Sequence, residues 1–107
     1  METTLEAIKE AIDTKDGVLL YFTGKSCNVC HSLKPKIEAL FKDEFPKIER
    51  YFLDAHEQKD ISAHFGVFSV PTILVFLDGK EFAREGRATS LSALKEKIKR
   101  PYEILLS

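Results

Sequence analysis

One stretch of the chain decides the fold, and it reads Val18-Leu19-Leu20-Tyr21-Phe22-Thr23-Gly24-Lys25-Ser26-Cys27-Asn28-Val29-Cys30. The apolar run from Val18 to Thr23 is typical of a strand that is buried on both faces. The stretch from Cys27 to about Phe45 has the apolar periodicity of a helix. The only two cysteines of the chain therefore lie at a strand-to-helix turn.

A C-x-x-C pair at such a turn is typical of thiol–disulfide chemistry. Unpaired N–H groups and the dipole at a helix N-terminus favour an anion, so we expect Cys27 to form a nucleophilic thiolate. Cys30 follows one helical turn later, close enough to close a disulfide with Cys27. The pair carries two electrons by itself, so no bound cofactor is expected.

Periodicity and turn residues predict the remaining elements on both sides of this stretch. The predicted elements are a helix over 3–13, strands over 18–23, 48–54, 72–77 and 80–85, a helix over 27–45, a short helix over 61–65, and a helix from Ser90 that Pro101 ends. A β-α-β unit requires a parallel strand pair, and Asp78-Gly79 predicts an antiparallel hairpin. The predicted fold class is therefore α/β, a single domain over residues 1–107 with a mixed sheet flanked by helices.

Four details of these elements can be checked individually. Thr3 and Glu6 have capping-box spacing at the start of the first helix. Val29 opens the apolar stripe of the second helix, and Pro35 is expected to kink that helix rather than to end it. The residues after Pro101, including Ile104 to Leu106, are expected to form a tail that packs on the domain.

Composition narrows the classes of partner. The formal net charge of −1 argues against a strongly charged surface that would bind nucleic acid or a membrane surface. The hydrophobic fraction of 44% favours a soluble domain with one core. We expect no membrane span and no signal peptide, since the N-terminus has neither a basic nor an apolar region. Cysteines confined to one motif fit a reducing compartment, so the cytoplasm is the expected location, and an exported one if a signal segment had been removed. A monomer is the default expectation.

With these motifs in order, the sequence resembles the thioredoxin family over most of its length. The matching features are the strand leading into Cys27-x-x-Cys30, Pro35, Phe65-Gly66-Val67 before Val70-Pro71-Thr72, the Asp78-Gly79 hairpin, Gly86 and the final amphipathic helix. The resemblance implies that Cys27 attacks the substrate and that Cys30 resolves the mixed disulfide. It also implies a cis peptide bond at Pro71 facing the disulfide, a Val70 backbone that pairs with an extended substrate, and a helix kink at Pro35.

The sequence departs from the family pattern at several positions. Ser26 replaces the tryptophan before the first cysteine, and Asn28-Val29 replaces Gly-Pro between the cysteines, which leaves the redox potential open. Tyr21 stands where the family has a buried acid that helps to deprotonate the resolving thiol. A core side chain with a satisfied hydroxyl is the simpler interpretation of Tyr21. The usual first strand of the family is also missing.

Other interpretations of the cysteine pair compete with redox chemistry. Cys27 to His31 matches the C-x-x-C-H signature of covalent haem, which would need His56 or His64 as a second ligand. Zinc bound by Cys27, Cys30 and His31 lacks an obvious fourth ligand, and the two cysteines could also be small core residues.

The other polar residues near the motif each have two interpretations. His31 either stabilises a thiolate or faces solvent. His56 and His64 are expected at the surface, and Lys25 is expected to be an ordinary exposed lysine. Arg87 is expected to be an exposed charge in the loop that borders the family's substrate groove.

The sequence therefore predicts a thiol–disulfide oxidoreductase that reduces disulfides in protein substrates. A reductase or another dithiol would recycle it, and neither a metal nor a nucleic acid takes part. The alternative is a binding or scaffold module of the same fold with weak redox activity, which Tyr21 and Ser26 favour.

Overall fold

The computed structural model describes residues 3–106 and contains four helices and four strands in that range. In chain order they are α1 (Leu5–Thr14), β1 (Gly17–Thr23), α2 (Asn28–Glu44), β2 (Glu49–Asp54), α3 (Lys59–His64), β3 (Thr72–Leu77), β4 (Lys80–Glu85) and α4 (Leu91–Leu105). The predicted order of elements is confirmed, and the bounds of β3 and β4 agree with the prediction residue for residue.

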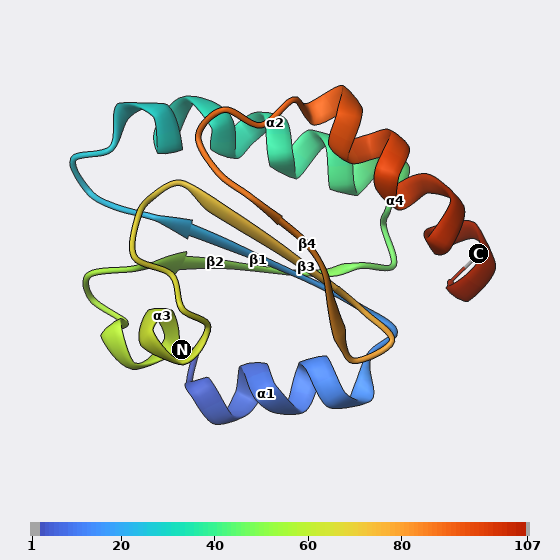
Figure 1. Ribbon diagram of the computed structural model, residues 1–107, viewed down its shortest axis with the longest axis horizontal. Coiled ribbons are helices and arrows are strands. Elements are labelled where there is room, and N and C mark those ends of the chain that lie inside the picture. Colours follow the sequence, from blue (N-terminus) through green and yellow to red (C-terminus); the bar gives the residue numbers. More distant parts are fainter. Residues whose placement is uncertain (1–2, 107) are drawn as a thin grey trace.

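The strands form one mixed sheet in the order β2-β1-β3-β4. β1 and β2 are parallel, while β1–β3 and β3–β4 are antiparallel. Helices α2 and α4 cover one face of the sheet and α1 and α3 cover the other (Figure 1). The fold class is therefore the predicted α/β one, with a mixed sheet flanked by helices, and in residues 3–106 no strand precedes α1.

Two apolar cores fill the space between the sheet and its helices. The core under α2 and α4 contains the buried residues Leu19, Tyr21, Ile37, Phe41, Phe45, Ile48, Ile73, Val75, Leu77, Ala83, Leu94, Ile98 and Tyr102. The core under α1 and α3 contains Ile8, Ala11, Ile12, Val18, Leu20, Phe22, Leu53, Ile61, Val67, Leu74 and Phe76. Residues of β1 alternate between the two cores, as expected for a central strand that is buried on both faces.

Local turn chemistry explains two of the connections. Asp78 and Gly79 have φ angles of 54° and 77°, the left-handed backbone that a two-residue hairpin between β3 and β4 requires. Gly66 has φ 66° just after α3, where the Gly66 and Val67 N–H groups donate to the carbonyls of Ala63 and Ser62. This pattern of bonds closes the C-terminus of α3, as the glycine predicted.

Three predicted details are wrong. The N-cap of α1 is Thr4, whose hydroxyl accepts the Ala7 N–H, and not Thr3. Val29 is 37% exposed, because in the first turn of α2 the inward-facing residue is the neighbouring Cys30, which is 1% exposed. Pro101 does not end the last helix, which continues to Leu105.

Packing at the C-terminus explains why α4 continues. Tyr102 is buried and its ring meets Phe45 edge-on at 5.1 Å between centroids. The Tyr102 hydroxyl accepts the Lys47 N–H, and Lys47 Nζ donates to the Leu106 carbonyl. These contacts offset the hydrogen bond that Pro101 cannot make. Of the predicted tail, Leu106 packs on the core, whereas Ile104 is 72% exposed; Ser107 lies outside the described residues.

Candidate functional site

Four loops meet at one end of the sheet because of the strand directions. Thr23 pairs with Asp54 in the parallel pair, so the segments that follow β1 and β2 leave the sheet side by side. Phe22 pairs with Thr72 and Ile73 pairs with Glu85, which brings the start of β3 and the end of β4 to the same end. The segments 24–27, 55–58, 66–71 and 86–89 therefore surround one place.

Cys27 and Cys30 form a disulfide at this place, with a Cα–Cα distance of 5.2 Å. Cys27 is the N-cap of α2, and its Sγ accepts the Cys30 N–H at 3.1 Å. Cys27 is half-buried, whereas Cys30 is only 1% exposed. A partner can therefore reach Cys27 more readily than Cys30, and the N-terminus of α2 favours negative charge on the Cys27 sulfur.

Tyr21 lies beneath this turn and is fully buried in β1. Its hydroxyl donates a hydrogen bond to the Cys30 carbonyl at 2.8 Å. Burial raises the pKa of Tyr21 to about 12, since a buried phenolate would lose its hydration. At neutral pH Tyr21 is therefore a hydrogen-bond donor, and a proton acceptor is missing at its position.

The other predicted site residues surround the disulfide. His31 is exposed and its Nε2 lies 3.1 Å from the Lys25 carbonyl, which requires a proton on that nitrogen. Pro35 is exposed and lies inside α2, which continues past it to Glu44. Pro71 is buried, and the Val70–Pro71 peptide bond is cis.

An open groove of about 240 Å³ exposes Cys27 to solvent, and it is lined by Gly24, Ser26, Cys27, His56, Val70 and Arg87. A methyl group placed on Gly24 would lie 3.4 Å from Val70 Cγ2 and 3.5 Å from His56 Cδ2, so both side chains close over this glycine. Val70 lines the groove and Pro71 follows it in the chain, and two basic side chains, His56 and Arg87, border the groove.

Sequence reasoning placed His56 at the surface and connected it with the cysteines only as a possible second haem ligand, not as a residue of the Cys27 groove. His56 is exposed, but Asp54 holds it at the groove, because Asp54 Oδ1 accepts the N–H groups of His56 and Glu57. These two bonds lower the pKa of Asp54, with the Glu57 bond contributing most. The available signal was topological, since the segments after two parallel neighbouring strands meet at one edge of a sheet.

Lys25 and His64 lie at the surface. Lys25 forms an exposed ion pair with Glu57 at 2.7 Å, and this contact raises the pKa of Lys25. The ring of His64 packs edge-on against Phe65, 4.8 Å away between centroids. Neither side chain lines the Cys27 groove.

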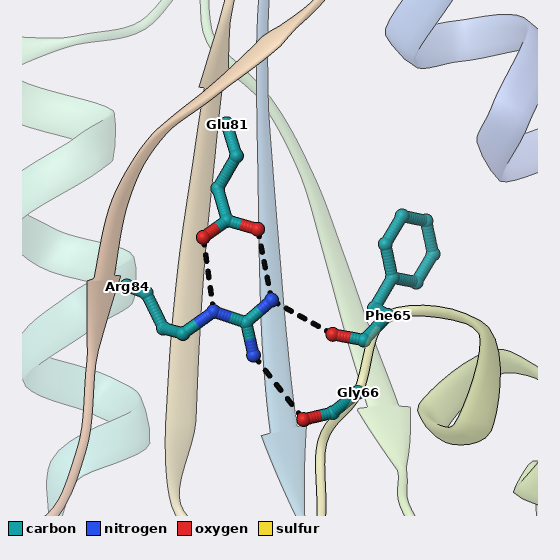
Figure 2. A network of polar contacts seen from close by, with 4 residues as sticks. All are labelled: Phe65, Gly66, Glu81 and Arg84. Atoms are coloured by element: carbon teal, nitrogen blue, oxygen red, sulfur yellow. Dashed lines mark hydrogen bonds and ion pairs between the residues drawn. The ribbon is translucent and has the colours of Figure 1, made fainter.

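A polar network fixes the segment that leads to Val70 and Pro71. Arg84 of β4 binds both carboxylate oxygens of Glu81, with Nε and Nη2 at 2.9 and 2.8 Å, and it donates to the carbonyls of Phe65 and Gly66 (Figure 2). One guanidinium group therefore ties the sheet edge to the end of α3. Nothing in the local sequence around Arg84 indicates this contact, which spans 18 residues or more.

None of the helices within residues 3–106 has the length and apolar character needed to cross a bilayer. In the same range, no three His, Cys, Asp or Glu side chains gather in a way that could hold a metal ion.

Comparison with known proteins gives consistent matches. A family model described as Thioredoxin matches residues 1–100. The thioredoxin-like protein YdfQ of Bacillus subtilis is 33% identical over 101 residues, which cover 94% of this chain and 89% of that protein. Thioredoxin-1 of Saccharomyces cerevisiae is 32% identical over 95 residues, covering 89% and 90%. The structure of thioredoxin 1 from Thermosipho africanus is 31% identical, with a TM-score of 0.73, and the match covers 81% of this chain and 96% of that one.

Proposed function

The chain belongs to the thioredoxin family, and on this premise we propose that it is a thiol–disulfide oxidoreductase that reduces disulfides in protein substrates. The observation that carries the proposal is the Cys27–Cys30 disulfide itself, with an accessible first sulfur at a helix N-terminus and a buried second one. This asymmetry suits a nucleophile and a resolving thiol.

The reaction proceeds in two exchange steps. The Cys27 thiolate attacks one sulfur of the substrate disulfide, which breaks that bond, forms a mixed disulfide and releases one substrate thiolate. The Cys30 thiolate then attacks the Cys27 sulfur, releases the second substrate thiolate and forms Cys27–Cys30. Two electrons pass to the substrate, and its two thiolates gain two protons. One replaces the proton that Cys30 loses before it attacks, and the other replaces the proton that Cys27 gave to water when it ionised. A reductase or another dithiol returns the pair to the reduced state.

The remaining residues have supporting roles in this proposal. The backbone of Val70, next to Pro71, pairs with an extended substrate segment that lies across the groove. Tyr21 holds the Cys30 end of the turn through the Cys30 carbonyl, and His31 holds the segment before Cys27 through the Lys25 carbonyl. Pro35 has no N–H group, so it removes one hydrogen bond from the part of α2 that follows Cys30.

The cellular setting is part of the same proposal. A chain whose cysteines all belong to one motif fits a reducing compartment, so we place it in the cytoplasm as a monomeric single domain. An equilibrium potential near −270 mV in glutathione buffers is expected for such a reductant, whereas a potential near −120 mV would indicate disulfide formation instead.

Trapping experiments test the reaction directly. A prereduced Cys30→Ser variant, mixed with a disulfide-bonded protein, should accumulate a mixed disulfide through Cys27 that mass spectrometry detects. A Cys27→Ser variant is the matched control and should trap far less, because Cys30 is buried. If the wild-type chain reduced no protein disulfide and both variants were inert, the binding or scaffold module would replace the oxidoreductase.

A further inference from the structure

Phe68 is the most exposed large apolar side chain in residues 3–106, with 90% of its surface accessible. An isolated exposed apolar residue is ordinary and carries no conclusion. The position of Phe68 is informative, however, because Phe68 lies three residues before Pro71 in the segment that borders the disulfide. Side chains of this size dominate the energetics of protein contacts when a partner covers them.

The backbone on both sides of Phe68 is fixed. Val67 is 5% exposed, and its N–H donates to the Ser62 carbonyl at 2.8 Å. On the other side, the Thr72 hydroxyl donates to the Ser69 carbonyl at 2.7 Å. Arg84 holds the start of the segment through the Phe65 and Gly66 carbonyls (Figure 2). A partner that covers Phe68 therefore has little loop motion to restrict, which lowers the entropic cost of binding.

Phe68 separates two hollows of the surface. One hollow, of about 220 Å³, is lined by Ala55, His56, Val67, Phe68, Ser69 and Val70. The other lies towards β4 and contains the charged side chains of Arg84 and Glu85. The first hollow shares His56 and Val70 with the Cys27 groove, so a bound segment can run from one into the other.

We propose that Phe68 is a specificity-determining residue, which packs against an aliphatic or aromatic side chain of the protein substrate in the first hollow. This inference rests on the proposed function. The continuity of the hollow with the Cys27 groove identifies the occupant as the same segment that carries the substrate disulfide. Apart from His56 the hollow has no ionisable lining residue, which favours an apolar side chain over a charged one.

Chain geometry limits where that side chain lies in the substrate. Phe68 is two residues from Val70, and an extended chain rises about 3.3 Å per residue. A substrate segment that lies across Val70 with its cysteine at Cys27 therefore brings a side chain to Phe68 about two to four residues from that cysteine. The preferred substrates are proteins with an apolar residue at this separation from an accessible disulfide.

Matched peptide disulfides test this preference. The two peptides of a pair differ only at one position, which is leucine in one and serine in the other. Different pairs place this position two, three or four residues before or after the cysteine, and a quenched fluorophore reports reduction. Single-turnover reactions with the prereduced full chain require no recycling enzyme. At the best position, the wild type should reduce the leucine peptide about fivefold faster or more, and Phe68→Ser should bring this ratio close to one. Phe68→Leu should keep most of the ratio.

Ile104→Ser is the matched control, because Ile104 is 72% exposed and lies in the last turns of α4, far from the N-terminus of α2 (Figure 1). This variant should keep the wild-type ratio. A ratio that stays high in Phe68→Ser, or that is near one in the wild type, would overturn the role of Phe68 while leaving the oxidoreductase intact. Loss of a dimer in Phe68→Ser with an unchanged ratio would assign the side chain to a second copy instead. A wild type that reduces neither peptide would refute the proposed function itself.

Discussion

At the level of single residues, Tyr21 shows how one side chain can change the proton chemistry of a site. It is buried beside Cys30 and donates to the Cys30 carbonyl at 2.8 Å. With its pKa raised to about 12 by burial, Tyr21 keeps its proton throughout the neutral range. We therefore expect Tyr21 to position Cys30 rather than to take its proton, so water or a substrate thiolate accepts that proton during resolution.

Tyr21→Phe tests this role without leaving a large cavity. Loss of the buried hydrogen bond should lower the free energy of unfolding by about 1 kcal/mol at pH 7 and slow the release of a mixed disulfide by Cys30. In the unfolded wild type the pKa of this tyrosine is 10.0, whereas in the folded protein burial raises it to about 12. The contribution of Tyr21 to the free energy of unfolding is therefore complete below pH 10 and is lost as the pH rises towards 12. Denaturant titrations of Tyr21→Phe should show a shallower alkaline decline.

Tyr51→Phe provides the control for that measurement. The pKa of Tyr51 is also raised to about 12, by burial first and then by its hydrogen bond to Glu49. The two variants should therefore share the effect on alkaline stability, whereas only Tyr21→Phe should slow resolution. Equal release rates in the two variants would contradict a positioning role for Tyr21.

At the level of elements, the sequence predicted what adjacent residues determine. Asp78-Gly79 and Gly66 need left-handed backbone, and the two central strands are apolar except for one threonine at an end of each, so these features are visible locally. The roles of His56, Phe68 and Arg84 depend on residues that are far away in the chain, so no local sequence pattern indicates them. Pro101 is the clearest case of packing that overrides a local signal, since Tyr102 holds the helix beyond it.

Pro101→Ala should therefore stabilise the protein. Alanine restores an N–H to the interior of α4 and removes the ring that crowds the preceding turn, while Tyr102 keeps its place against Phe45. Proline is intrinsically about 3 kcal/mol less favourable than alanine inside a helix. We therefore expect the free energy of unfolding to rise by about 1 kcal/mol or more in urea titrations. Pro46→Ala, outside the helices, should bring no gain. A loss of stability in Pro101→Ala would mean that the last turn depends on the proline itself.

At the level of the whole molecule, the order and directions of the strands bring the parts of the site together. No single element contains it, because it forms where all four strands bring their connecting segments to one end of the sheet. The cysteines come from the start of α2, His56 from the segment after β2, and Phe68 and Pro71 from the segment before β3. The edge strand β4 contributes through Arg84, which joins it to the end of α3.

Arg84→Ala should loosen the whole of the segment that presents Phe68. Without the guanidinium the carbonyls of Phe65 and Gly66 lose their partner on β4, so the Val67 amide should exchange with solvent faster in hydrogen-exchange measurements. Lys95→Ala, which breaks an ion pair with Glu44 that touches no loop, is the control and should leave that amide unchanged.

Acid should produce the same loosening in the wild type. The hydrogen bond to Arg84 lowers the pKa of Glu81, so the contribution of the pair is complete above the ordinary carboxyl pKa and is lost as the pH falls through the lowered value. After correction for the intrinsic pH dependence of exchange, Val67 protection should therefore drop at acidic pH in the wild type and change little in Glu81→Gln, which lacks the titrating carboxyl. Equal acid profiles in the two proteins would show that Arg84 holds the loop through the Phe65 and Gly66 carbonyls alone.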